Sequence, residues 1–346
     1  MAGRGAHRAT RGRAGRGALI VLLVVVVLAA AAFGLYRYAV GASGPSRPVA
    51  LEITEGSTAS DVGELLEGRG VIRSALAFRI SAQLRGYGSE IQAGAYELTT
   101  NMPIGRVFEV LEAGPIVETV SLTVPEGLEL PEIAATVGEQ LRLDAGRFER
   151  AATSGRYALD PYLPEGTETL EGFLFPKTYE FGTEGLDEEA VIDRLLAQFE
   201  TEASTLDWSR TENLGLSHYE TVIVASLIER EARVPEDRAK ISAVIHNRLA
   251  EGMPLQIDAS VQYALPEENR ELTFEDYEFE SPYNTYLHPG LPPTPIASPG
   301  LAALEAALNP ADADFLYFVV IDPNTGRHAF AETYDEFLRL REEAGL

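Results

Sequence analysis

Two glutamates that follow an apolar stretch are the residues of this sequence best suited to acid–base chemistry. Residues 222–228 carry no charge, and Glu229 comes directly after them. An apolar environment disfavours an ionised carboxylate and raises its pKa, which suits a general acid. Glu231 lies about 200° further around a helix, so the two side chains cannot both point into one cleft. We predict Glu229 as the acid and expect Glu231 to lie outside the cleft. The alternative is that both are surface residues or pair with Arg230 and Arg233.

A second group of polar residues lies in the segment LQIDASVQY, at 255–263. Polar and apolar residues alternate there, which predicts a half-buried strand with one polar face. A plain amphipathic edge strand or loop would show the same alternation. The polar positions are Gln256, Asp258, Ser260 and Gln262.

A third group lies at the start of the proline-rich segment PYNTYLHPGLPPTPIASPG, at 282–300. It sets Tyr283, Asn284, Thr285 and Tyr286 beside a turn that the prolines stiffen. Aromatic faces and amide groups suit a pyranose ring, because they offer stacking and paired hydrogen bonds. A rigid irregular loop explains the segment almost as well.

Several kinds of chemistry are excluded by what the sequence lacks. It contains no P-loop and no GxGxxG, GxSxG or HExxH pattern. It contains no cysteine, so thiol nucleophiles, disulfides and cysteine-bound metals are excluded too. Asp312 and Asp314 form a DxD spacing among alanines that is typical of a solvated turn, and the five histidines are scattered. We expect neither a metal nor a cofactor.

The charge balance argues against a polyanionic partner. Acidic residues outnumber basic ones 53 to 28, and the formal net charge is −25. A surface this negative repels phosphate polymers. We therefore expect no nucleic acid partner.

The N-terminus has the pattern of a membrane anchor. Residues 1–17 contain five arginines and no acid, and residues 18–36 contain no charge at all. A helix over 18–40 is long enough to cross a hydrocarbon layer of about 30 Å. Basic residues stay on the cytoplasmic side, so we expect residue 41 onward to lie outside. A cleaved signal peptide is the alternative, although the apolar run is longer than that class needs.

The elements that position these residues follow the membrane segment. Residues 41–48 are a short linker, and 49–118 predict a small α+β module. A helix at 217–231, apolar on nearly all sides, should lie deep in the second part and carry Glu229. The remaining expected helices are 59–67, 74–84, 104–111, 131–140, 144–153, 186–203, 235–252 and 299–308, and the expected strands are 49–54, a segment around Tyr96, and 315–321, with a hairpin-like turn at 323–326.

Four segments together resemble one known family. They are LEGFLFPKTY (170–179), ASLIEREA (225–232), HNRLAEGMPLQIDASVQYAL (246–265) and YNTYLHPGLPPTPIASPG (283–300). In type and order they closely resemble the endolytic murein transglycosylases of the YceG-like family. The resemblance covers roughly residues 120–332, and the preceding module looks like that family's LysM-like subdomain.

The resemblance implies an α+β protein with an N-terminal transmembrane helix, a LysM-like module at 49–118 and a mixed α/β YceG-like catalytic domain at 119–346. It implies cleavage of the MurNAc–GlcNAc β-1,4 bond in nascent peptidoglycan strands, which leaves 1,6-anhydroMurNAc ends and terminates strand elongation. Glu229 matches the family's catalytic glutamate. The residues that would bind glycan are Gln256, Asp258, Ser260, Tyr263, Tyr283, Asn284, Thr285 and Tyr286.

The resemblance also implies partners and a location. The expected partners are peptidoglycan glycan strands, the bacterial inner membrane through a single-pass anchor, and peptidoglycan synthases, with the large domain on the outer or periplasmic side. Lys177 stands where the family usually has aspartate, and Ala259 where it often has proline. Two alternatives stay open: a muramidase-type hydrolase in which Asp258 activates water, and a glycan-binding scaffold without catalysis.

Overall fold

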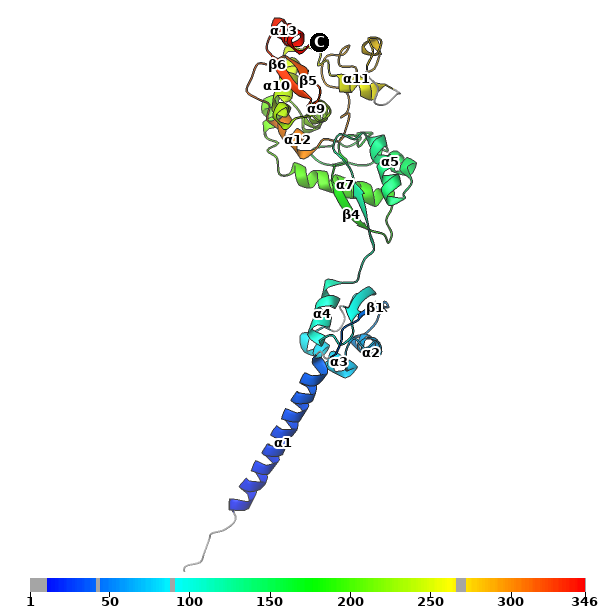
Figure 1. The fold of residues 1–346 in the computed structure, drawn as a ribbon, viewed down its shortest axis with the longest axis vertical. Helices are drawn as coiled ribbons and strands as arrows, with labels where there is room; N and C mark the ends of the chain where they lie inside the picture. The colour runs from blue at the N-terminus through cyan, green and yellow to red at the C-terminus, as the bar shows by residue number, and fades with distance from the viewer. Residues whose placement is uncertain (1–10, 42–43, 88–90, 266–271, 346) are drawn as a thin grey trace, which may run out of the picture. The chain divides into compact units, whose positions relative to one another are not determined.

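The chain folds into two compact units of mixed α/β structure. A computed structural model describes residues 11–41, 44–87, 91–265 and 272–345 (Figure 1). The units are Met1–Glu118 and Thr119–Leu346. Each has its own hydrophobic core, formed by residues between Leu51 and Leu111 in the first and between Leu122 and Leu308 in the second. Helices predominate, and each sheet in the described part of the chain is a pair of antiparallel strands.

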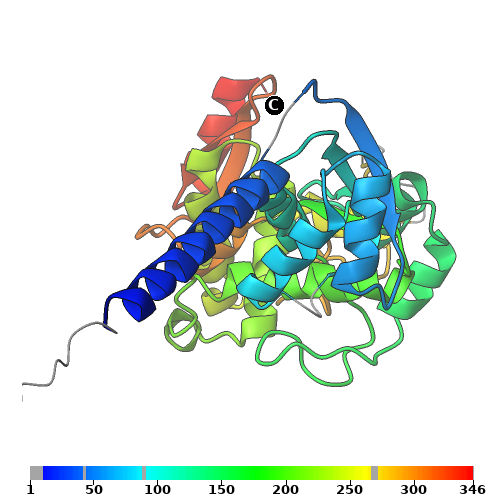
Figure 2. The ribbon, with the colours of Figure 1, turned by 90° about the horizontal axis from the view of Figure 1, so that it is seen from below.

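The first unit begins with one long helix, α1 (Arg11–Val40), which Figure 2 shows running without interruption. Its segment Leu19–Val40 has a mean hydropathy of 2.9 and is exposed over most of its length. Leu28 and Leu35, for example, are 64% and 71% exposed. This length and composition are compatible with a single-pass membrane anchor. Of the predicted basic tail, residues 1–10 lie outside the described residues.

A small α+β module completes the first unit. Strand β1 (Pro48–Ile53) pairs with β2 (Gly94–Thr99), and Leu51 lies opposite Tyr96. The helices α2 (Ala59–Gly68), α3 (Ala75–Arg85) and α4 (Ile104–Ala113) share the core of this hairpin. Local signals start the first two helices, because the side chains of Thr58 and Ser74 accept hydrogen bonds from backbone N–H groups in the first turn.

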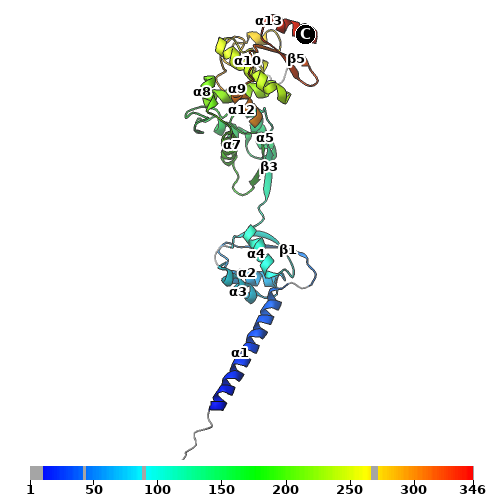
Figure 3. The same cartoon turned by 90° about the vertical axis from the view of Figure 1, so that its left-hand side faces the viewer.

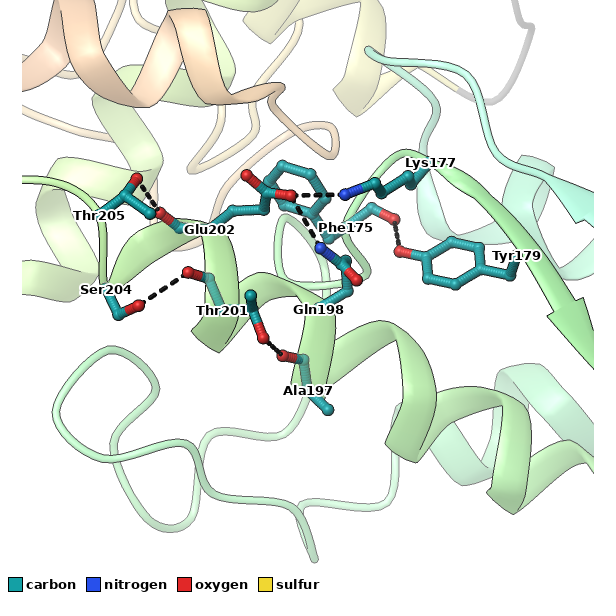
Figure 4. Close-up of polar contacts among 9 residues, drawn as sticks. All are labelled: Phe175, Lys177, Tyr179, Ala197, Gln198, Thr201, Glu202, Ser204 and Thr205. Carbon is teal, nitrogen blue, oxygen red and sulfur yellow. Dashed lines mark hydrogen bonds and ion pairs between the residues drawn. The ribbon is translucent and has the colours of Figure 1, made fainter. Parts of the chain in front are cut away.

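The second unit opens with a two-stranded sheet flanked by helices. Strand β3 (Thr119–Thr123) pairs with β4 (Thr178–Gly182). Lys177, just before β4, donates to Glu202 Oε1 on a helix at 2.7 Å, and Gln198 Nε2 donates to the same oxygen at 2.8 Å (Figure 4). This departure from the family pattern therefore attaches β4 to that helix. The helices are α5 (Leu130–Leu141), α6 (Ala145–Ala152), α7 (Glu188–Ala203), which carries Glu202, and α8 (Arg210–Leu214).

The rest of the second unit is built around a buried helix, α9 (His218–Glu231). In Figures 1 and 3, α9 and α12 (Leu301–Leu308) lie between the β3–β4 region and a second group of elements. That group contains a helical turn at Pro235–Asp237, α10 (Arg238–Glu251), the hairpin of β5 (Tyr317–Asp322) and β6 (Arg327–Ala331), and α13 (Tyr334–Ala344).

Most of the predicted elements are confirmed, and one is wrong. Residues 255–263, predicted as a strand or loop, contain the helix α11 (Asp258–Ala264). The buried Leu255 and Ile257 do alternate with the exposed Gln256, but these residues form a non-helical entry to the helix and not a strand. A nine-residue segment is too short for its period to separate the two structures. The helices α8 and α13 were not predicted.

The glycine of the LEGF segment is expected to be essential for packing. Gly172 has φ +84°, and a Cβ there would lie 2.4 Å from Pro295 Cβ. Gly166 has the same φ of +84° with nothing within 4 Å of a built Cβ. Both alanine variants carry the backbone strain, but only Gly172→Ala must also displace a neighbour, which typically costs about 1–3 kcal/mol more. Urea unfolding followed by the fluorescence of Trp208, the single tryptophan, measures this difference. Equal losses in the two variants would contradict the packing argument.

Candidate active site

Helix α9 carries both glutamates that the sequence singles out. Its start is defined by a capping box: the Ser217 side chain accepts a hydrogen bond from the Glu220 N–H, and the Glu220 side chain accepts one from the Ser217 N–H. Residues 221–228 are all buried, so the helix passes through the middle of the unit. Glu229 and Glu231 therefore lie where the helix leaves the core. Carboxylates are also unfavourable at a helix C-terminus, where the partial charge is negative.

Glu229 lies against the start of α12. Its Oε2 accepts a hydrogen bond from the Gly300 N–H at 3.1 Å. Burial raises the pKa of Glu229, the Gly300 N–H opposes this, and the nearby charges of Glu126 and Arg238 raise and lower it respectively. Glu126 packs so closely on Gly300 that any Cβ there would clash with it. The carboxyl of Glu229 thus joins α9 to the N-terminus of α12, which stabilises its ionised form.

Glu231 lines a pocket, whereas it was expected to lie outside the cleft and Glu229 to point into it. The pocket has a volume of about 340 Å³, and Asp258 and Gln262 of α11 line it with Glu231. Burial, and after it the charge of Asp258, raise the pKa of Glu231, whereas the Ala259 N–H and the neighbouring arginines oppose the rise. The resulting pKa is about 7. The 200° separation does hold the two glutamates apart. The expectation was wrong because α9 is enclosed on both of these sides.

Ala259, a departure from the family pattern, contributes through its backbone. Its N–H is hydrogen-bonded to the Glu231 carboxyl and lowers the pKa of that group. A proline at this position would have no N–H to donate. The alanine therefore limits the rise in the pKa of Glu231.

Two of the predicted glycan-binding residues meet beside Glu231. Tyr286 Oη donates to Asp258 Oδ1 at 2.6 Å, and the Tyr286 ring packs on Tyr277 with the centroids 4.6 Å apart. Burial, then Asp258, and more weakly Glu231 raise the pKa of the Tyr286 hydroxyl. Gln256 is exposed at the entry to α11 with φ 55°, and its backbone N–H donates to Thr285 O.

Three other predicted glycan-binding residues are buried and hold the loop instead. Ser260 and Thr285 bond to each other at 2.9 Å, and Thr285 Oγ1 also accepts from the Ile257 N–H. Asn284 Nδ2 donates to Tyr277 O and Phe279 O. These three residues are 0–2% exposed. Their burial corrects the expectation that they line a sugar groove. They fix the start of α11 and the position of Tyr286.

Tyr263 and Tyr283 belong to a second polar network, centred on a residue that the sequence analysis missed. Glu171 Oε2 accepts from the Leu130 N–H at 3.0 Å and from Tyr263 Oη at 3.3 Å. The Tyr263 and Tyr283 rings are 4.9 Å apart, and Tyr283 Oη bonds to Thr294. Burial raises the pKa of Glu171 to about 8. Its position inside the apolar run LEGFLF was the signal available in the sequence.

The β5–β6 hairpin supplies the other wall of the pocket, which the sequence analysis also missed. Gly326 and His328 line it, together with the exposed side chain of Arg233. Gly326 packs on the aliphatic part of Arg233 so closely that a Cβ would lie 2.4 Å from Cδ. His328 is buried and held by Asp237, whose Oδ2 accepts from the His328 N–H at 2.8 Å and lies 3.1 Å from Nδ1. The Gly-x-His pattern at 326–328 was the available signal.

The site places Glu231, whose pKa is raised, beside a second carboxyl group, that of Asp258. Glu231 and Asp258 share a pocket that also presents Arg230 and Arg233. Arg230 is held by Gly127 O at 3.0 Å and Glu129 at 3.5 Å, whereas Arg233 is exposed to solvent. Within residues 11–41, 44–87, 91–265 and 272–345, no group of three or more histidines, aspartates or glutamates is arranged to hold a metal ion. The arrangement suits proton transfer to a neutral substrate.

Glu171 is expected to make the stability of the second unit depend on pH. The native state keeps its proton up to about pH 8, whereas the ordinary pKa is 4.5. Stability therefore falls as pH rises from 5 to 8, by at most about 1.4 kcal/mol per pH unit from this group. Glu171→Gln should flatten that slope, and Glu180→Gln, an exposed control on β4, should not. Urea unfolding at several pH values measures the slopes, and parallel curves for wild type and Glu171→Gln would refute the assignment.

Comparison with known proteins places this architecture in one family. A profile of the YceG-like family matches residues 51–343. The endolytic murein transglycosylase of Bacillus subtilis is 33% identical over 307 residues, which cover 85% of this chain and 84% of the relative. The protein of that name from Streptococcus pneumoniae R6 is 32% identical over 322 residues, and the match covers 83% of this chain but 57% of the relative.

A solved structure agrees with the sequence matches. The crystal structure of a YceG-like protein from Listeria monocytogenes aligns with a TM-score of 0.56 at 31% identity, over 86% of this chain and 100% of that one. The family profile extends across both units, and the relatives match most of this chain. The chain therefore belongs to the YceG-like family.

Proposed function

We propose that this protein is an endolytic lytic transglycosylase of peptidoglycan in which Glu231 is the proton donor. The observation that carries the proposal is the Glu231 carboxyl, which lines a pocket with its pKa raised to about 7 beside Asp258. The names of the relatives supply the substrate class, since they are called murein transglycosylases. A general acid works best with a pKa near the working pH.

The reaction needs one carboxyl group in two roles. Protonated Glu231 gives its proton to the glycosidic oxygen as the bond from the muramyl C1 to that oxygen breaks. The resulting carboxylate then takes the proton of the muramyl 6-hydroxyl while O6 bonds to C1. The products are a new 4-hydroxyl on the leaving sugar and a 1,6-anhydro ring, and Glu231 is protonated again. No water is consumed, unlike the usual reaction of two-carboxylate glycosidases.

The neighbours of Glu231 fit the charge that develops on the sugar. The transition state resembles an oxocarbenium ion, so a nearby anion stabilises it. The carboxyl group of Asp258 occupies that position, and the hydrogen bond from Tyr286 Oη holds it in place. Gln262 and Arg233 offer donors to the polar groups of the glycan at the pocket wall.

Glu229 remains the alternative acid that the sequence analysis predicts. Its pKa is raised too, but its Oε2 is engaged by the Gly300 N–H at the start of α12. We therefore infer that Glu229 orients the end of α9, and that its neighbour two residues on does the chemistry.

A muramidase-type hydrolase is the competing reaction, and the same pocket supports it. Asp258 and Glu231 line one cavity, so Asp258 has a position from which it could activate a water molecule. The products separate the two reactions, because hydrolysis leaves reducing ends whereas transglycosylation leaves anhydro ends. A scaffold without catalysis would leave the strands intact.

The proposal extends to the rest of the chain. α1 anchors the protein in the bacterial inner membrane with residue 41 onward on the outer side, as the five arginines before its apolar segment favour. The module at 49–118 acts as a LysM-like unit that holds the glycan chain, and cleavage beside peptidoglycan synthases terminates strand elongation.

The two glutamates can be separated by matched variants. Glu231→Gln keeps the size of the side chain but removes the transferable proton, so turnover of uncrosslinked glycan strands should fall by about 10²- to 10⁴-fold. Glu229→Gln should stay within about tenfold of wild type, because its amide can still contact the Gly300 region. Mass spectrometry of the products measures both rates and identifies the ends.

Three outcomes would contradict the proposal. A severe loss in Glu229→Gln with Glu231→Gln almost unaffected would return the role to Glu229. Reducing ends in place of anhydro ends would make the protein a hydrolase. Intact strands after incubation with a folded wild-type protein would favour the scaffold.

The charge of Asp258 should set the pH dependence of the reaction. Because Asp258 raises the pKa of Glu231, its removal in Asp258→Asn lowers that pKa. The acid is active when protonated, so activity declines as pH rises through its pKa, near 7 in wild type. The alkaline limb of kcat/KM in Asp258→Asn should therefore move to lower pH. A limb that stays in place or moves upward would show that Asp258 does not act on the acid.

A further inference from the structure

One face of α3 is apolar and exposed. Leu76, Ile80 and Leu84 recur every four residues on this helix and are 55%, 39% and 77% exposed. The opposite face is buried in the module, with Phe78 stacked on Phe108 at 4.9 Å. A helix with one face in the core and a second apolar stripe in water is unfavourable unless something covers the stripe. We call these three residues the α3 stripe.

The α3 stripe continues the surface of the membrane-spanning helix. Tyr36 Oη of α1 lies 2.9 Å from Ser81 Oγ of α3, and Arg73 Nη1 donates to Tyr38 O at 2.8 Å. A groove of about 390 Å³ is lined by residues 32, 35, 36 and 39 of α1 together with Leu76 and Ile80. These α1 positions fall inside the apolar segment Leu19–Val40. The α3 stripe therefore lies beside the C-terminal end of the apolar segment of α1.

The segment that contains α3 is basic, unlike the rest of the protein. Residues 68–87 contain four arginines and no acid, in a chain with 53 acidic residues. Arg73 stacks over the Tyr38 ring at 4.3 Å from its centroid. Arg37 and Arg85 line a second groove between α1 and the module. There Arg85 lies over the Phe108 ring, 4.8 Å from its centroid, and makes a long 3.8 Å contact with exposed Glu112. Arginines and tyrosines at the edge of a membrane span match the headgroup layer.

We propose that α3 lies in the headgroup layer of the bilayer that α1 crosses. The α3 stripe contacts the upper parts of the acyl chains, and the arginines around it contact lipid phosphates. The proposal rests on the membrane anchor and is independent of the reaction. It makes α3 an interfacial helix that holds the module against the membrane surface, with α1 as its fixed point.

Spin labels can test this directly because the chain has no cysteine. Single cysteines replace Leu84, Leu76, Val24 of α1 and exposed Glu52 of β1 in the full chain, in phosphatidylcholine–phosphatidylglycerol nanodiscs that hold one protein copy. Collision of each nitroxide with oxygen, which dissolves in lipid, and with a nickel chelate, which stays in water, reports its environment. We expect the labels at 84 and 76 to resemble the label at 24, with a several-fold higher oxygen-to-nickel ratio than at 52.

Each other outcome has a definite meaning. If the labels at 84 and 76 are both accessible to nickel and the label at 24 is in lipid, α3 does not lie in the headgroup layer although α1 crosses the membrane. A nickel-accessible label at 24 overturns the anchor and this position of α3 together. If the labels at 84 and 76 are shielded from both reagents and show spin–spin broadening in discs that hold two copies, another copy of the protein covers the α3 stripe. That result would also overturn the proposal.

Discussion

The removal of carboxyl groups from water at the end of α9 is the constraint on which the site depends. The helix is uncharged and buried over residues 221–228, so it crosses the core, and the charged residues that end it emerge among packed elements. Burial favours the protonated form of each carboxyl. Each glutamate accepts a backbone hydrogen bond, Glu229 from Gly300 and Glu231 from Ala259. Each also lies near a second carboxyl that raises its pKa, but only Glu231 lines a pocket together with that partner, Asp258. When the environments of two carboxyl groups separate their pKa values, the group with the higher pKa is the candidate general acid.

The pocket around Glu231 is assembled from segments that are distant in sequence. One wall is the start of α11, held by the buried bond between Ser260 and Thr285. The other is the β5–β6 hairpin, where Gly326 allows the close approach of Arg233. The buried polar residues of the loops thus position the site, and few of them face it. Replacing any one would leave a hydrogen-bonding group unpaired in the core, which is costly.

Much of the fold could be predicted from the sequence, because its signals are local. The capping residues Ser217, Thr58 and Ser74 mark helix starts. The buried residues of α5, α7 and α10 recur with a helical period. The site was harder, because its residues depend on tertiary neighbours. The angle between Glu229 and Glu231 was predictable, but what covers each side of α9 was not. Asn284 and Thr285 have the residue types of sugar ligands, and only their burial assigns them to the loop.

The most direct test of the account is the titration of the Glu231 carboxyl itself. Full-length protein labelled with ¹³C at the glutamate side-chain carboxyls, in detergent micelles, gives resonances that shift with protonation, and Glu231→Gln and Glu229→Gln assign the two signals. The account predicts that Glu231 titrates near pH 7, above Glu229, and that its midpoint falls in Asp258→Asn. A midpoint for Glu231 near the ordinary value of 4.5 would mean that it is ionised at neutral pH and cannot be the proton donor.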